Sequence, residues 1–71
     1  MLSSLAVRQA RTLREALAEA GISAHDLWWC YFGLGGAVGH LEVDAYVHQA
    51  LDLPGSDRDL LQHAAVGLTA A

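Results

Sequence analysis

Hydrophobic residues recur with the period of an α-helix in the first part of this chain. One stripe collects the apolar side chains, with Gln9 as its only polar member, and the opposite side carries arginines and glutamates. Ser3 or Ser4 can accept a backbone N–H at the start, and Gly21 suits the left-handed residue that ends many helices. The pattern predicts a helix near residues 4–20. Its apolar stripe consists of Leu2, Leu5, Ala6, Leu13, Ala16, Leu17 and Ala20.

A second helix is predicted near residues 24–34, in a segment that is apolar around nearly its whole circumference. Ser23 and Asp26 have the spacing of a capping box with a shortened acid, so the helix is expected to begin beside them. From Leu27 to Gly39 the chain holds four of its five aromatic residues and no charge. Because so bulky an uncharged run needs shielding from water, it forms the centre of the fold, the contact surface for a partner, or both.

Two further amphipathic helices are predicted near residues 41–51 and 57–68. Residues 53–55 form a turn between them, and Ser56 with Asp59 repeats the pattern of a serine followed by an acid at a helix start. The inner faces consist of Val43, Tyr46, Val47, Ala50 and Leu51 in the third helix and of Leu60, Leu61, Ala64, Ala65 and Leu68 in the fourth.

A chain of 71 residues has room for one domain, so we predict a single domain over residues 1–71. Its fold class is all-α, a small bundle of about four short helices with short connections. A chain of this size buries only about 60% of the surface that its unfolded form exposes, so the core is small. We expect that core to contain Leu13, Leu17, Leu27, Tyr31, Val47, Leu60 and Ala64.

The composition indicates more apolar surface than one copy can bury. Hydrophobic residues make up 54% of the chain, its mean hydropathy is +0.27, and 17% of residues are charged, against roughly 25% in soluble domains. Trp28 and Trp29 diverge by about 100° on a helix, so one of them should lie at the surface. We predict an interaction or regulatory module that docks against itself, as a homodimer, or against another protein. The predicted partner-binding residues are Leu27, Trp28, Trp29, Tyr31 and Phe32.

The charge distribution argues against a nucleic-acid partner. The formal net charge is −4, and Asp and Glu number 8 against 4 basic residues, all of them arginine. Non-specific affinity for DNA comes from neutralising phosphates, which an acidic chain does poorly. The alternative function is a small helix-turn-helix-like DNA-binding regulator, because Gly21 joins two predicted helices and Arg8, Arg11 and Arg14 share one face. Its second helix would expose aromatic residues instead of the polar side chains that contact bases.

The sequence carries no catalytic signature, so we predict a protein that is not an enzyme and needs no cofactor. The glycines between Gly33 and Gly39 suggest a phosphate loop, but a dinucleotide fingerprint needs a glycine where Val38 stands, and a Walker loop needs a lysine. We interpret the run as a loop between helices. Cys30 has no second cysteine to pair with and is interpreted as a small buried hydrophobe.

Two of the four histidines follow an aspartate by four residues, Asp44 with His48 and Asp59 with His63. This spacing places both members of each pair on one helix face, where they can interact locally. Ordinary helix-surface pairing explains them without a metal ion. We therefore predict no metal site.

The apolar run of residues 27–39 is too short to span a bilayer as a helix, which takes about 20 residues. Charged residues near the N-terminus, Arg8, Arg11 and Arg14, interrupt the apolar region that a secretory signal would need. We expect no membrane span and a cytoplasmic location.

Several short segments between residues 22 and 66 carry a resemblance to other proteins. They are Asp26-Leu27-Trp28, Tyr31-Phe32-Gly33-Leu34-Gly35-Gly36, Leu41-Glu42-Val43-Asp44-Ala45-Tyr46, Leu53-Pro54 and Arg58-Asp59-Leu60-Leu61-Gln62-His63-Ala64. In these helix starts, aromatic residues and glycines, the chain resembles small uncharacterised all-helical proteins of high-GC bacteria. The resemblance implies a helical fold and a regulatory or adaptor setting, and it transfers no functional residue.

Overall fold

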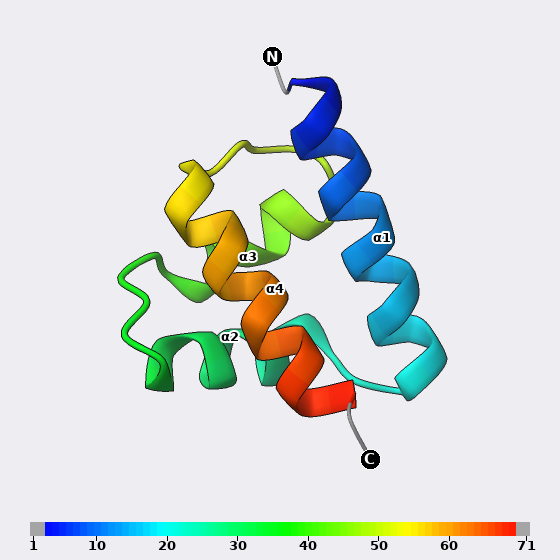
Figure 1. Ribbon diagram of the computed structural model, residues 1–71, viewed down its shortest axis with the longest axis vertical. Coiled ribbons are helices and arrows are strands. Elements are labelled where there is room, and N and C mark those ends of the chain that lie inside the picture. Colours follow the sequence, from blue (N-terminus) through cyan, green and yellow to red (C-terminus); the bar gives the residue numbers. More distant parts are fainter. Residues whose placement is uncertain (1–2, 70–71) are drawn as a thin grey trace.

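The computed structural model describes residues 3–69 and shows four helices, with no strand in that range (Figure 1). In chain order the helices are α1 (Ser4–Ala20), α2 (Ala24–Gly33), α3 (His40–Val47) and α4 (Gly55–Thr69). α1 and α2 each pack against both α3 and α4. In Figure 1, α4 crosses in front of α3, between α1 on the right and α2 at the lower left. The prediction of a small all-α bundle is confirmed.

Serine caps and a left-handed glycine set the ends of the first two helices. Ser3 accepts a hydrogen bond from the N–H of Ala6 at 3.1 Å, and Ser23 accepts one from the N–H of Asp26 at 3.0 Å. Gly21 follows α1 with a left-handed φ of 69°. Each of these residues satisfies backbone groups that the helix itself leaves without partners, as the sequence indicates.

Helix α3 is shorter than predicted because Gln49 ends it. It stops at Val47 instead of near residue 51, and Gln49 adopts a left-handed φ of 64°. This conformation brings the N–H of Ala50 to the carbonyl of Ala45 at 2.8 Å, which closes the end of the helix. Leu51, predicted on the inner face, is exposed as a result.

Helix α4 begins two residues earlier than predicted. It starts at Gly55, and the carbonyl of Pro54 accepts two backbone N–H bonds of 3.0 Å from its first turn. Ser56 therefore lies inside the helix. The predicted start, with Ser56 as the capping residue and Asp59 as its acid, is wrong because the turn before the helix supplies the first acceptor.

The buried core lies where α3 and α4 meet α1 and α2. Six of the seven predicted core residues are buried, whereas Leu60 is only partly buried and Leu61 is fully buried beside it. Leu68, near the end of α4, is exposed. The buried hydrophobic residues are Ala6, Ala10, Leu13, Leu17, Leu27, Tyr31, Val43, Tyr46, Val47, Leu53, Leu61, Ala64 and Ala65.

The apolar stripe of α1 differs from the prediction near both ends. Leu5 is 56% exposed, because the first turn of α1 extends past the neighbouring helices in Figure 1. Ala20 is exposed in the last turn, and Ala10, which the predicted stripe left out, is fully buried. Leu2, also predicted on the stripe, lies outside the described residues.

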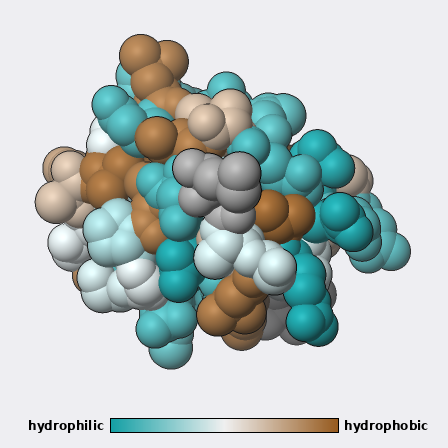
Figure 2. Space-filling view, turned by 90° about the horizontal axis from the view of Figure 1, so that it is seen from above, coloured by the Kyte–Doolittle hydropathy of each residue, from teal (hydrophilic) through white to brown (hydrophobic). Residues whose placement is uncertain are grey.

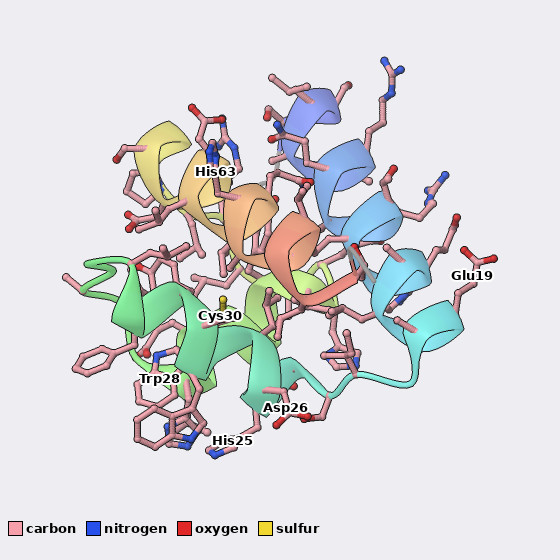
Figure 3. All side chains as sticks on the ribbon, turned by 60° about the horizontal axis from the view of Figure 1, so that its bottom comes forward. Glu19, His25, Asp26, Trp28, Cys30 and His63 are labelled. Atoms are coloured by element: carbon pink, nitrogen blue, oxygen red, sulfur yellow. The ribbon has the colours of Figure 1, made fainter. Side chains whose placement is uncertain are left out.

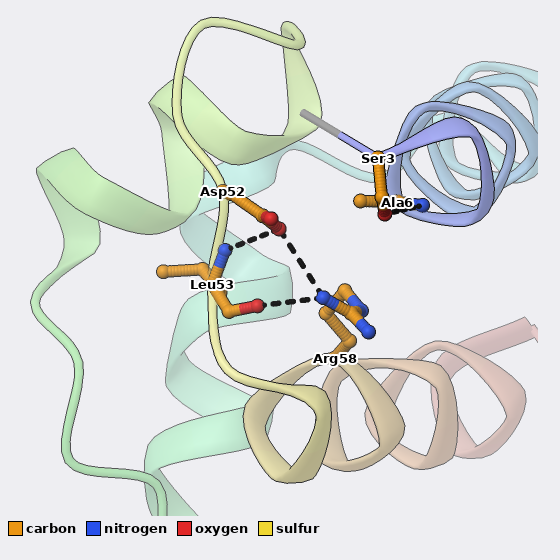
Figure 4. Close-up of polar contacts among 5 residues, drawn as sticks. All are labelled: Ser3, Ala6, Asp52, Leu53 and Arg58. Carbon is orange, nitrogen blue, oxygen red and sulfur yellow. Dashed lines mark hydrogen bonds and ion pairs between the residues drawn. The ribbon is translucent and has the colours of Figure 1, made fainter. Parts of the chain in front are cut away.

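A polar clamp holds the connection between α3 and α4 (Figure 4). Nη1 of Arg58 donates to Oδ1 of Asp52 at 3.2 Å and to the carbonyl of Leu53 at 2.8 Å. The same oxygen of Asp52 accepts the N–H of Leu53 at 2.8 Å. The Arg58 guanidinium is therefore committed to fixing the turn before α4.

Candidate functional site

The large apolar residues of α2 divide between the inside and the outside of the bundle. Leu27 and Tyr31 are predicted both as core residues and as partner-binding residues; they are fully buried, which confirms the first prediction and contradicts the second. Trp29 and Phe32 are 56% and 51% exposed, and Trp28 is partly buried. Positions four apart share a helix face, which explains why Leu27 and Tyr31 both face the core and why Trp28 and Phe32 lie together on the other face. The expectation that one of the two tryptophans reaches the surface is confirmed.

Five ring side chains from α2 and α3 form one group at the surface, here called the aromatic patch: His25, Trp28, Trp29, Phe32 and His40. The ring centre of Trp28 is 5.0 Å from that of Trp29 and 5.3 Å from that of Phe32. His25 on α2 and His40 on α3 meet edge to face at 5.8 Å. Figure 3 shows His25 and Trp28 projecting from α2 away from α4. These separations are those of favourable aromatic pairs.

Hydrogen bonds hold both indole rings of the aromatic patch. The Nε1–H of Trp28 donates to the carbonyl of Val38 at 2.8 Å, and the Nε1–H of Trp29 donates to Nε2 of His25 at 2.9 Å. As the acceptor, this nitrogen of His25 carries no proton in the arrangement. These two bonds restrict the conformational freedom of both indole side chains.

The loop between α2 and α3 supports the patch from the core side. Gly36 is buried against the ring of Tyr31, where a Cβ at Gly36 would collide with it. The hydroxyl of Tyr31 donates to Oδ1 of Asp57 at 2.7 Å and accepts the N–H of Val38 at 3.0 Å. Val38 thus connects the core tyrosine to Trp28 in the patch. The glycine run forms a close-packed connection between helices.

The tyrosine hydroxyls are held in their protonated form by their surroundings. Burial raises the pKa of Tyr31, the N–H of Val38 opposes this shift, and the Asp57 carboxylate adds to it. Burial also raises the pKa of Tyr46, and the charge of Arg58 opposes it. At neutral pH the Tyr31 hydroxyl is therefore a hydrogen-bond donor to Asp57.

The two aspartate–histidine pairs predicted from the sequence differ in the structure. Nδ1 of His48 lies 3.5 Å from Oδ1 of Asp44 and 2.9 Å from the carbonyl oxygen of the same residue. Asp59 and His63 are both exposed, and the ion pairs of the described residues do not include them. Within residues 3–69 no three metal-ligating side chains come together.

The free thiol lies on the opposite side of α2 from the patch. Cys30 is partly buried, and its Sγ is 3.7 Å from the carbonyl oxygen of Ala64 in α4. Figure 3 shows the sulfur directed toward α4, away from Trp28. This position fits a small hydrophobe that fills the space between two helices.

The arginines of α1 are separate from the aromatic patch. Arg8, Arg11 and Arg14 are all exposed on a helix that packs against α3 and α4. Arg8 and Leu5 line a hollow between α1 and α4. Figure 2 shows the surface at this end of the molecule, where hydrophobic residues lie among hydrophilic ones. An open hollow of mixed polarity lacks the enclosed apolar character of most small-molecule sites.

No protein-family model, curated protein or solved structure matches this chain. None of the described helices has both the length and the apolar character that crossing a lipid bilayer requires.

Sequence reasoning missed three residues that build the aromatic patch: His25, His40 and Val38. The spacing of four between His25 and Trp29 could have indicated their contact on α2. No comparable signal exists for His40 or for the carbonyl of Val38, because both meet Trp28 only through the fold of the loop.

Proposed function

We propose that this protein is a non-enzymatic interaction module of the bacterial cytoplasm that docks through the aromatic patch, against a second copy as a homodimer or against another protein. The observation that carries the proposal is the half-exposed pair Trp29 and Phe32, standing on a scaffold that already holds Trp28 in place. Fully burying one large apolar side chain is worth about 1.5–3 kcal/mol. Tryptophan is also among the residues that dominate binding energy at interfaces.

Two exposed leucines extend the apolar character around the patch along the chain. Leu34 follows the end of α2, and Leu41 follows His40 at the start of α3. Both lie within two residues of a patch member. A partner seated on the patch would therefore find aliphatic side chains beside the rings, which is the mixture expected at the centre of a protein interface.

The alternative function is a small helix-turn-helix-like DNA-binding regulator that uses Arg8, Arg11 and Arg14. The exposure of these three side chains on α1 favours it. The net charge of −4 opposes it, since phosphate binding rewards positive charge. Neither α2 nor α3 contributes an arginine or lysine to such a surface.

The proposed function is tested by comparing the wild type with a double variant, Trp29→Ala with Phe32→Ala. Sedimentation at micromolar concentration, with and without duplex DNA, measures self-association and DNA binding. Capture from a lysate of the source cell, with tagged wild type and tagged variant in parallel, measures binding to other proteins. We expect the wild type to form a dimer or a defined complex and the double variant to lose it.

Val66→Ala serves as the matched control, because Val66 is 65% exposed on α4, outside the patch. This variant should keep every interaction of the wild type. A wild type that stays monomeric and captures nothing, or a double variant that keeps the same partner, would contradict the proposal. A shift in sedimentation only with duplex DNA would favour the alternative.

A further inference from the structure

The charges of this chain are separated along the sequence. No arginine or lysine occurs from residue 15 to residue 57, and seven of the eight acids lie there. Helices α2 and α3, which carry the aromatic patch, therefore contain carboxylates and histidines but no permanent positive charge. The permanent charges on these two helices are those of Asp26, Glu42 and Asp44, all of them negative.

Two of these acids are close in sequence to histidines of the patch. Asp26 follows His25 in the first turn of α2, is exposed, and lies at the same end of that helix in Figure 3. The carboxylate of Glu42 folds back over Gly39, where a Cβ would collide with it. Gly39 is the neighbour of Val38, whose carbonyl holds Trp28. Each of the two helices that carry the patch thus has a carboxylate within two residues of a patch histidine.

The rings themselves attract positive charge. The face of an aromatic ring carries partial negative charge, and a guanidinium or ammonium group within about 6 Å of a tryptophan or phenylalanine ring is bound by it. Trp29 and Phe32 meet nearly at right angles, 86° between ring planes, and both are half exposed. A cation placed on the exposed face of either ring would contact its partial negative charge.

The chain does not fill this place with its own arginines. Arg58 is held by Asp52 and the carbonyl of Leu53, and the other three arginines lie on α1. A second copy would present the same helices, whose permanent charges are all negative, and like charges in an interface are unfavourable. A positively charged partner supplies the cation that the chain itself does not place there, and it avoids repulsion between like charges.

We propose that the occupant of the aromatic patch is an arginine-bearing segment of another protein, with apolar side chains beside its arginines; this rests on the proposed function. A guanidinium stacks on the rings and pairs with Asp26 or Glu42, and the apolar neighbours cover Phe32. Arginine suits the place better than lysine, because its planar group can stack and form two parallel hydrogen bonds at once.

The test uses the two tryptophans as reporters, since the chain has no others and both belong to the patch. The probe is a tryptophan-free helical peptide with leucine and arginine on one face. A matched peptide carries citrulline, which has the same shape without the charge, in place of each arginine. Tryptophan emission and the two indole N–H signals in NMR spectra follow the titrations. We expect the arginine peptide to bind at least about tenfold more tightly than the citrulline peptide.

Variants test whether the difference in affinity between the two peptides depends on the acids near the patch. Asp26→Asn with Glu42→Gln should weaken the arginine peptide severalfold and leave the citrulline peptide unchanged, and Asp59→Asn, an exposed acid on α4, should change neither. Equal affinity for the two peptides, or no indole response at millimolar arginine peptide, would overturn the inference. If a captured protein still depends on Trp29 but binds the Asp26 and Glu42 variant normally, the inference fails while the proposed function stands. A dimer that the Trp29 and Phe32 variant abolishes would show that a second copy occupies the patch, which also overturns the inference.

Discussion

Helix α2 carries four aromatic residues, which differ in burial and in hydrogen-bond partners between its two faces. On the inner face the ring of Tyr31 is fully buried, Gly36 lies against it, and Asp57 and Val38 bind its hydroxyl. On the outer face Trp29 remains half exposed, bound to another member of the same helix. Aromatic content alone therefore does not define a core. A ring belongs to the core only where another segment covers it.

The largest change in the free energy of unfolding is expected from a substitution on the inner face of α2. Replacing Tyr31 by alanine should lower the free energy of unfolding by about 3–5 kcal/mol, the usual cost of removing a buried aromatic ring. That is a large part of the total expected for so small a domain. Urea unfolding followed by circular dichroism measures it. Tyr31→Phe, the matched control, keeps the ring and should lose only about 1–3 kcal/mol, because Val38 and Asp57 lose their partner. A loss below 1 kcal/mol for the alanine variant would place Tyr31 outside the core.

The second prediction concerns the glycine that covers Tyr31. Gly36→Ala should destabilise the protein by about 1–3 kcal/mol, because its methyl group must displace a packed ring. Gly33→Ala is the control, since a Cβ there meets nothing within 4 Å. Thermal unfolding of both variants gives the comparison. Equal effects of the two substitutions would mean that the loop is not packed against the tyrosine.

The helical period identified the elements of this fold but not where all of them end. It predicted α1 closely, because serine and glycine stand at its two ends and each has a strong positional preference. It extended α3 through Ala50 and Leu51, since glutamine rarely adopts the left-handed conformation that Gln49 has. The end of α3 depends on tertiary packing, which a single sequence does not display.

The candidate site was also predictable only in part, because local helix geometry can be read from the sequence but tertiary packing cannot. The divergence of Trp28 and Trp29 followed from helix geometry alone. Which of the bulky residues face the core depends on where α4 and the glycine loop pack. The sequence therefore predicts Leu27 and Tyr31 both in the core and on the contact surface, and only the first prediction is right. His40 joins the patch from another helix, a contact that local spacing does not indicate.

The third prediction uses alkaline pH to ionise the buried tyrosines, among them Tyr31 on the inner face. The pKa of Tyr31 is raised by burial, so the folded protein keeps a proton that the unfolded chain releases above about pH 10. A raised pKa stabilises the protein below that pH, and the stabilisation is lost as pH rises further. Tyr46 acts in the same direction. Unfolding free energies between about pH 8 and pH 11 should therefore fall, and fall less in Tyr31→Phe. A curve that stays flat in the wild type would contradict the account.

The smallest effect on stability is predicted for the outer face, and it provides the most direct test of the division between the two faces. The double variant Trp29→Ala with Phe32→Ala should lower the free energy of unfolding by about 0.7–1.5 kcal/mol per side chain, half the value of full burial, because both side chains are already half exposed. The same preparation should lose the dimer or complex that the wild type forms. The decisive measurement is therefore urea unfolding and sedimentation on this one variant. A smaller loss of stability per side chain than that of Tyr31→Ala, together with lost association, is the predicted result, whereas a loss per side chain like that of Tyr31→Ala, or unchanged association, would contradict it.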